Sequence, residues 1–125
     1  MFKILAIDDE PDFLKVLSKD LEAPGKYEIL TASTAREGIK KAREILPNLI
    51  FMDVLLPDMG GADAIKAMKA YPELSKIPVI LLTGIVKPEE GEHSLEINID
   101  ENWYLAIAKP YDKEYLLSQV EEKLK

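Results

Sequence analysis

Residues 2–11 read Phe-Lys-Ile-Leu-Ala-Ile-Asp-Asp-Glu-Pro, a short apolar run that stops abruptly at three acidic residues and a proline. The run from Phe2 to Ile7 predicts a buried strand, because a short apolar run bounded by turn signals is typical of strands inside a sheet. Pro11 suits the first turn of a helix, and apolar residues then recur at helical spacing until Pro24. This stretch therefore predicts a strand, an acidic loop and a helix.

The same alternation continues along the chain. Further strands are predicted at Tyr27–Ala32, Leu49–Met52, Val79–Leu82 and Trp103–Ala108. Further helices are predicted over Ala35–Leu46, over Ala62–Ala70 and after Asp112, with Thr34 and Glu37 forming a capping box and Asp112 an N-cap. Strands that are apolar on both faces and alternate with helices indicate an α/β fold, in which a five-stranded parallel sheet has helices on both faces.

Size and composition limit the possible functions. The 125 residues predict a single domain over 1–125, with no output domain. The absence of cysteine excludes a disulfide framework and thiolate metal sites. The net charge of −7 argues against direct binding to nucleic acid or an anionic membrane. Neither a signal peptide nor a membrane span is recognisable, and we expect a cytoplasmic protein.

Polar residues stand where the predicted strands end, namely Asp8, Asp9, Asp53, Thr83 and Lys109. Right-handed crossovers bring the carboxyl ends of parallel strands to one edge of the sheet, where ligands bind. We therefore expect these side chains to form one site.

The residue types in this set indicate phosphoryl chemistry. Three carboxylates that converge repel one another unless a cation neutralises them, and their hard oxygens suit Mg²⁺. Lys109 supplies a positive charge suited to phosphate oxygens, and Thr83 supplies a hydroxyl that can donate one hydrogen bond. One carboxylate could then attack phosphorus in line and form an acyl phosphate.

At this point the chain resembles the receiver domain of two-component response regulators over essentially its whole length. Four segments carry the resemblance, Ile7-Asp8-Asp9-Glu10-Pro11, the loop from Asp53 to Gly61, Leu82-Thr83-Gly84 and Lys109-Pro110-Tyr111. The resemblance implies a flavodoxin-like doubly wound sheet. It also implies a phosphoacceptor rather than a turnover enzyme, which a histidine kinase or histidine phosphotransfer protein phosphorylates and which signals to a further protein by contact.

Site roles follow from the same resemblance. It implies that Asp53 is the phosphoacceptor and that Thr83 and Lys109 contact the phosphoryl oxygens. It implies that Asp9 holds Mg²⁺ together with Asp53, with Asp8 acting largely through water and the backbone carbonyl of Leu55 as a further ligand. The Lys109–Pro110 bond is expected to be cis, as is typical of the family.

Two features depart from the family pattern. Ala106 stands where the family usually has Tyr or Phe, and Tyr104 lies two residues away on the same face of the strand. The segment 85–102 has little helical periodicity, so the fourth helix is expected to be irregular. In addition, the apolar Leu55 and Ile85 occupy the positions that control loss of the phosphoryl group in the family, and we expect that loss to be slow.

Two other functions are compatible with parts of this pattern. A receiver-like binding module that is not phosphorylated would fit the altered segment 85–102, but not the complete set of acidic, threonine and lysine residues. A Mg²⁺-dependent phosphohydrolase would use an aspartyl phosphate, but it would also need a substrate-covering element and a general acid. Stoichiometric labelling favours the receiver, whereas steady turnover favours the phosphohydrolase.

Overall fold

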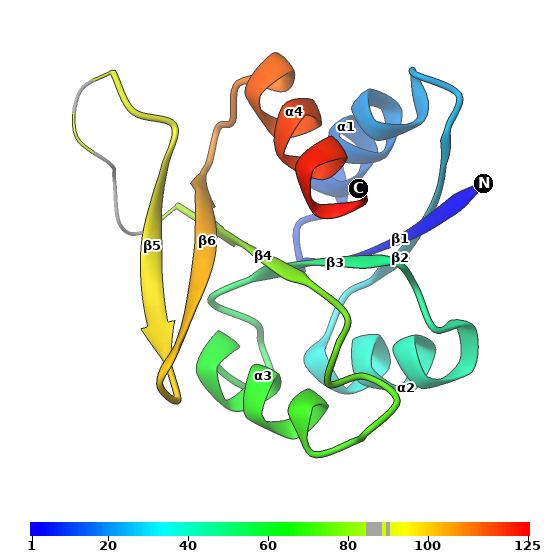
Figure 1. Ribbon diagram of the computed structural model, residues 1–125, viewed down its shortest axis with the longest axis vertical. Helices are drawn as coiled ribbons and strands as arrows, with labels where there is room; N and C mark the ends of the chain where they lie inside the picture. The colour runs from blue at the N-terminus through cyan, green and yellow to red at the C-terminus, as the bar shows by residue number, and fades with distance from the viewer. Residues whose placement is uncertain (85–88, 90) are drawn as a thin grey trace.

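The computed structural model describes residues 1–84, 89 and 91–125, which form a six-stranded sheet between two layers of helices (Figure 1). In chain order the elements are β1 (Phe2–Ile7), α1 (Pro11–Glu22), β2 (Tyr27–Ala32), α2 (Ala35–Ile45), β3 (Leu49–Asp53), α3 (Gly61–Lys69), β4 (Val79–Thr83), β5 (Ser94–Ile99), β6 (Asn102–Ala108) and α4 (Lys113–Lys123). The strands lie in the order β2-β1-β3-β4-β6-β5. All neighbours pair in parallel except β5 and β6, and the predicted doubly wound sheet is confirmed.

Helices cover both faces of the sheet, as the strand composition predicts. Helices α1 and α4 lie on one face, and α2 and α3 lie on the other (Figure 1). Strands β3 and β4 are buried along their whole length because both of their faces contact helices. Each face has its own apolar cluster, with Leu17, Leu21, Leu116 and Val120 on one side and Ala42, Ile65 and Met68 on the other.

Side chains cap the starts of two helices as predicted. The Thr34 hydroxyl accepts a hydrogen bond from the Glu37 amide at 3.1 Å, and the Glu37 carboxylate accepts one from the Ser33 amide at 2.7 Å. Asp112 accepts from the Tyr115 amide at 2.9 Å at the start of α4. The Glu37 and Tyr115 amides have no partner inside their own helix, and these bonds satisfy them, whereas the Ser33 amide precedes α2. In the described part of the chain, no helix has the length and apolar character needed to cross a membrane.

The segment 85–102 differs from the expected irregular helix. Its described part contains β5, which runs antiparallel to β6, so the sheet has six strands rather than five. Apolar residues alternate with polar ones along β5, and this period of two favours a strand with one buried face. The side chains that pack into the core are Leu95, Ile97 and Ile99. The part of the expectation that concerns residues 85–88 and 90 falls outside the described residues.

A two-residue turn joins β5 to β6. Asp100 and Glu101 have φ angles of 53° and 68°, and the flanking residues Ile99 and Asn102 are paired. Positive φ at both central residues is the requirement of a type I′ hairpin turn, which fits the twist of the strands. The hairpin therefore forms without the glycine that usually marks such a turn.

Candidate functional site

The predicted site residues come together at the carboxyl edge of the sheet. Asp8 follows β1, Asp53 ends β3, Thr83 ends β4 and Lys109 follows β6. The Lys109 amide donates to the Thr83 carbonyl at 2.8 Å, which continues the pairing of β4 and β6 by one residue. The Lys109–Pro110 bond is cis, as the resemblance implies.

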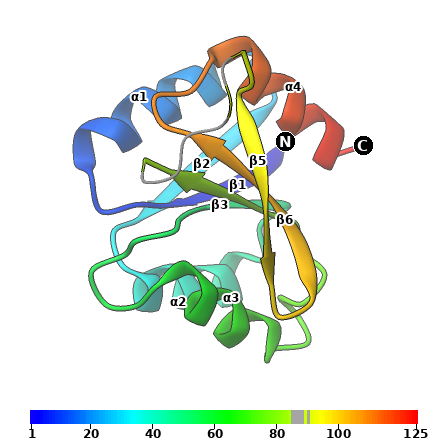
Figure 2. The same ribbon diagram turned by 90° about the vertical axis from the view of Figure 1, so that its left-hand side faces the viewer.

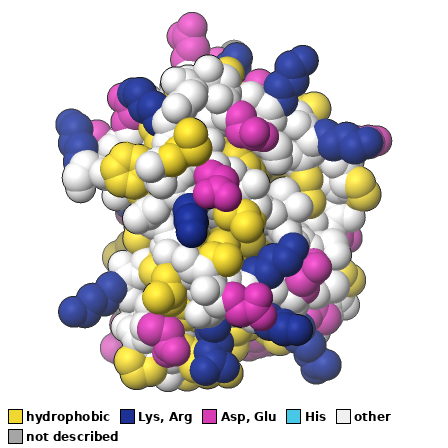
Figure 3. All heavy atoms as spheres, turned by 90° about the vertical axis from the view of Figure 1, so that its right-hand side faces the viewer, with side chains coloured by type: hydrophobic (Ala, Val, Ile, Leu, Met, Phe, Trp, Pro, Cys, Tyr) yellow, Lys and Arg dark blue, Asp and Glu magenta, His cyan; other side chains and the backbone are white. Residues whose placement is uncertain are grey.

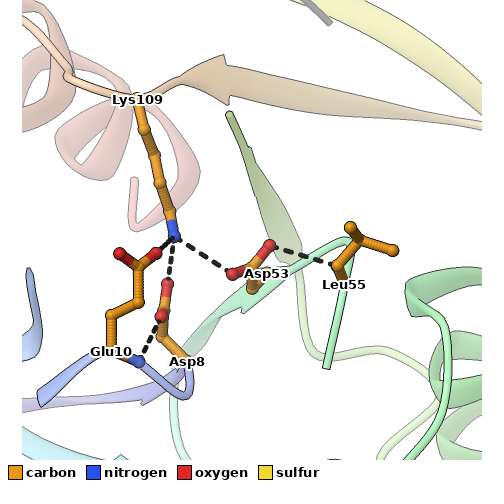
Figure 4. A network of polar contacts seen from close by, with 5 residues as sticks. All are labelled: Asp8, Glu10, Asp53, Leu55 and Lys109. Carbon is orange, nitrogen blue, oxygen red and sulfur yellow. Dashed lines mark hydrogen bonds and ion pairs between the residues drawn. The ribbon is translucent and has the colours of Figure 1, made fainter. Parts of the chain in front are cut away.

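The Lys109 ammonium is the centre of this arrangement (Figure 4). Its Nζ atom lies 2.6 Å from Asp8 Oδ2, 3.0 Å from Glu10 Oε1 and 3.0 Å from Asp53 Oδ2. It also lies 4.3 Å from the centroid of the Phe13 ring, whose face attracts a cation. Burial acts to lower the pKa of Lys109, but its hydrogen bonds to the three carboxylates outweigh burial and hold that pKa above its ordinary value. Lys109 is therefore protonated at neutral pH.

Asp8 is fully buried beneath this ammonium. Burial is the largest influence on its carboxyl group and raises its pKa, although hydrogen bonds from Lys109 and from the Glu10 amide act in the opposite direction. The negative charge of Asp53 raises the pKa further. One lysine shared among three carboxylates therefore compensates only partly for burying Asp8.

Asp53 is held from two directions. Its Oδ2 atom accepts from Lys109, and its Oδ1 atom accepts from the Leu55 amide at 3.1 Å. Its side chain is 10% exposed, so the carboxylate remains accessible to a ligand from one side. These bonds orient the carboxylate without covering it.

Four carboxylates form an acidic cluster around the site. One oxygen from each of Asp8, Asp9, Glu10 and Asp53 lies within 4.8 Å of the others. Asp9 and Glu10 are exposed, whereas Asp8 and Asp53 are buried. Sequence reasoning did not assign Glu10 to the site, although it is the third acid in the run that starts at Asp8.

A small open pocket of about 340 Å³ gives access to the cluster, and its lining includes Asp53, Lys109, Asp9, Glu10, Leu55 and Gly84. The side chain of Leu55 is 59% exposed beside the pocket. Thr83 is buried at the end of β4, and Ile85 lies outside the described residues. The pocket thus combines hard oxygen ligands with one cation, which is the composition that a divalent metal and a phosphoryl group require.

Comparison with known proteins gives one consistent result. A family model described as the response regulator receiver domain matches residues 4–121. PhoP of Bacillus subtilis, an alkaline phosphatase synthesis transcriptional regulatory protein, is 32% identical over 98% of this chain and 48% of its own length. Protein PilH of Pseudomonas aeruginosa is 32% identical over 96% of this chain and 95% of its own. The chain therefore spans about half the length of PhoP and nearly all of PilH.

One solved structure that is similar in fold contains a metal. The receiver domain of the sensor histidine kinase PA1611 from Pseudomonas aeruginosa has a TM-score of 0.80 and 22% identity, covering 98% of this chain and 97% of its own. That structure is described with a magnesium ion coordinated in its active-site cleft.

Proposed function

Because the chain belongs to the response regulator receiver family, we propose that Asp53 accepts a phosphoryl group from a histidine kinase or phosphotransfer protein and that the phosphorylated form signals through protein contacts. The proposal includes a cytoplasmic location, because a kinase that uses ATP needs the compartment that holds it. The observation that carries the proposal is the position of Asp53 in the pocket, oriented by Lys109 and by the Leu55 amide.

Accessibility distinguishes Asp53 from the other acids. Asp8 is fully buried, so an incoming phosphorus atom cannot reach its carboxylate. Asp9 and Glu10 are exposed on the loop after β1, and neither ends a strand. Asp53 ends a central strand, and an orienting donor holds each of its oxygens. A fixed, partly accessible carboxylate is the group best placed for in-line attack.

The proposed transfer moves a phosphoryl group from a nitrogen of the donor to an oxygen of Asp53. A carboxylate oxygen of Asp53 forms a bond to phosphorus while the phosphorus–nitrogen bond of the donor phosphohistidine breaks. The electron pair of that bond stays on the imidazole nitrogen, and the ring leaves as neutral imidazole because the other ring nitrogen of the phosphohistidine already carries a proton. Lys109 would stabilise the negative charge on the transferring group, because its ammonium already lies 3.0 Å from Asp53 Oδ2.

The acidic cluster fits a magnesium ion. Its ligand atoms are hard oxygens that lie close together, and burial raises the pKa of Asp8 in a way that a neighbouring cation would reverse. We propose that Asp8, Asp9, Asp53 and the backbone carbonyl of Leu55 hold Mg²⁺, with Asp8 acting largely through water. When bound, this ion would neutralise charge on the phosphoryl oxygens. Glu10 is close enough to take part.

The proposed role is that of a phosphoacceptor rather than a turnover enzyme. The described lining of the pocket offers Lys109 and carboxylates, but no histidine or tyrosine that could protonate a leaving alcohol. A carboxylic acid could do so only if it stayed protonated. Thr83 is proposed to donate its hydroxyl to a phosphoryl oxygen from its place at the end of β4.

The test is incubation with acetyl phosphate and Mg²⁺ followed by intact mass measurement. We expect one added phosphoryl group on the wild type and none on Asp53→Asn, because the amide keeps the volume but is not a nucleophile. Asp63→Asn, at an exposed aspartate in the first turn of α3, is the matched control and should label normally. Labelling of folded Asp53→Asn would contradict the assignment. Steady release of phosphate, many equivalents per chain, would indicate a phosphohydrolase.

A further inference from the structure

Strand β5 forms one edge of the sheet, and β2 forms the other. Within the described part of the chain, β5 pairs only with β6, so its second side carries backbone groups that no strand occupies. Figure 2 looks onto this edge, with β5 running lengthwise across the front of the molecule. Such an edge is a template for another strand.

The direction of the backbone groups follows from one hydrogen bond. The His93 carbonyl accepts from the Ala108 amide at 3.2 Å, so the backbone of residue 93 faces β6. Backbone groups alternate in direction along an antiparallel strand, and the register of β5 and β6 is continuous. The N–H and C=O groups of Ser94, Glu96 and Asn98 therefore face outward.

The two edges of the sheet differ in how they are protected. At β2, the Ala32 carbonyl accepts a hydrogen bond from the Asp8 amide and so points toward β1. Successive carbonyls of a strand point in opposite directions, so the Thr31 carbonyl faces away from β1. Lys41 Nζ donates a hydrogen bond to the Thr31 carbonyl at 2.5 Å and also forms an ion pair with Glu37 at 3.7 Å. Charged side chains of both signs are spread over the face on this side (Figure 3). Lys41 belongs to α2, and its ammonium on this edge carbonyl discourages pairing with another chain.

Strand β5 has no such protection, because no lysine in the described part of the chain bonds one of its backbone carbonyls. It reads Ser-Leu-Glu-Ile-Asn-Ile, with no lysine, no proline and a single charge at Glu96. Its register with β6 is continuous, so no bulge bends it away from a partner. These are the properties of an edge that is built to pair.

We propose that β5 pairs antiparallel with β5 of a second copy of this chain, with the two-fold axis at Ile97. In this register Glu96 lies opposite Asn98 of the second copy, and each such pair exchanges two backbone hydrogen bonds. The sheet would then continue through both molecules. The proposal does not depend on phosphorylation of Asp53.

Charge favours this register over the registers that are shifted along the strand in either direction. Only registers that place outward-facing residues opposite one another can form hydrogen bonds, which restricts shifts to steps of two. The step in one direction places Glu96 opposite Glu96, and the step in the other places Glu96 opposite Asp100. Like charges directly opposite are destabilising. The register centred on Ile97 instead places the glutamate opposite a neutral amide that can donate to it.

The same register also matches the apolar side chains. Ile97 lies opposite Ile97, and Leu95 lies opposite Ile99, on the face that already packs into the core. On the other face, Trp103 is the cross-strand neighbour of Asn98 and is 67% exposed. A row across the joined sheet would run from Trp103 through Asn98 to Glu96 and Leu105 of the second copy. The exposed indole would then gain a partner surface.

The test is sedimentation velocity of the full chain from micromolar to millimolar concentration, with opposite charges placed at position 98. Asn98→Glu would create two like-charge pairs by symmetry, and we expect the dimer dissociation constant to rise by about three- to thirtyfold. Asn98→Lys would place a lysine opposite each Glu96 and should lower the dissociation constant. Ala23→Glu and Ala23→Lys, at the exposed end of α1 beside β2, are charge-matched controls and should leave it unchanged.

Amide hydrogen exchange tests the same pairing without any substitution. The Glu96 and Asn98 amides should become protected as the wild-type concentration rises, while emission from Trp103, the single tryptophan, shifts to shorter wavelength. A chain that stays monomeric to millimolar concentration would overturn the proposal, as would larger assemblies instead of a dimer. The proposal would also be overturned if neither Asn98→Glu nor Asn98→Lys changed the dimer dissociation constant, or if both variants raised it.

Discussion

The Lys109 ammonium and the Oδ2 atom of Asp8 lie 2.6 Å apart, although the two residues are 101 positions apart in the chain. Asp8 is fully buried and the Lys109 side chain is 11% exposed, so the pair is largely shielded from water. Lys109 thus partly compensates the negative charge of Asp8, which the fold buries. The same ammonium bonds Asp53 Oδ2 in the proposed phosphorylation site. A substitution of Lys109 should therefore affect both the stability of the fold and the site.

Loss of this ammonium should destabilise the fold. Removing one partner of a buried ion pair leaves an uncompensated charge, and we expect Lys109→Met to lower the free energy of unfolding by about 3 kcal/mol at pH 7. Lys113→Met is the matched control, because Lys113 pairs with Asp20 at 3.8 Å and is 54% exposed. That change should stay within about 0.5 kcal/mol. Urea denaturation measures both, and equal losses in the two variants would refute the argument.

The raised pKa of Asp8 predicts how stability depends on pH. The folded chain holds the Asp8 proton more tightly than the unfolded chain, in which the carboxyl has its ordinary pKa of 3.8. The contribution of Asp8 to stability is therefore fully present below pH 3.8 and is lost as the pH rises through the raised pKa.

A comparison of wild type with Asp8→Asn isolates this effect. We compare the free energy of unfolding of Asp8→Asn with that of the wild type. Between pH 4 and pH 7 the difference, Asp8→Asn minus wild type, should become more positive as the pH rises, by at most about 1.4 kcal/mol per pH unit. Urea titrations at closely spaced pH values supply the two curves. Parallel curves would mean that Asp8 has an ordinary pKa in the folded protein.

Magnesium should stabilise the native state through the acidic cluster. A ligand that binds only the folded chain adds about 2.7 kcal/mol at a hundredfold excess over its Kd. We therefore expect millimolar Mg²⁺ to raise the Tm of the wild type and of Asp12→Ala, whose carboxylate lies on α1. The increase should be much smaller for Asp9→Ala. Identical increases for Asp9→Ala and wild type, measured at matched ionic strength, would rule out the proposed ligand set.

The turn between β5 and β6 offers a test of backbone strain. Glu101 has a φ of 68°, a region where a side chain with a Cβ atom costs about 1 kcal/mol and glycine does not. Glu101→Gly should raise the free energy of unfolding by about 0.5–1 kcal/mol, because Gly is the preferred residue of a type I′ turn. Glu96→Gly, in the extended part of β5, is the control and should destabilise. Thermal unfolding of both variants gives the comparison.

The position of the site was predictable because it depends on topology rather than on side-chain detail. Asp53 and Lys109 stand at the ends of apolar runs, and parallel strands bring such ends to one edge. The contact of Glu10 with Lys109 was not predictable in this way. It depends on the path of the loop after β1, which periodicity does not report.

Strand β5 was missed for a different reason. The alternation of apolar and polar residues from Ser94 to Ile99 was present in the sequence, but the expected order of strand and helix favoured a helix in that segment. The Asp100-Glu101 turn lacks the glycine that normally indicates a hairpin. The structure of residues 94–99 therefore depends on pairing with β6, because the local sequence contains no turn signal.

The lifetime of the phosphorylated form should depend on Leu55. Its side chain is 59% exposed beside the pocket, and its amide holds Asp53 Oδ1 at 3.1 Å. An apolar side chain cannot hydrogen-bond the water that must attack the acyl phosphate in line, so we expect slow loss of the phosphoryl group. Ile85, the second position in this prediction, lies outside the described residues.

The measurement is the decay of labelled protein in Mg²⁺, followed by intact mass. Leu55→Asn combined with Ile85→Glu should decay faster than the wild type, because both polar groups can orient water. Leu55→Asn alone should give part of the gain, since only its side chain changes while the backbone amide still holds Asp53. Val16→Asn, at an exposed apolar residue on α1, is the control and should decay like the wild type. A double variant that decays no faster would show that apolar shielding by these side chains does not set the lifetime.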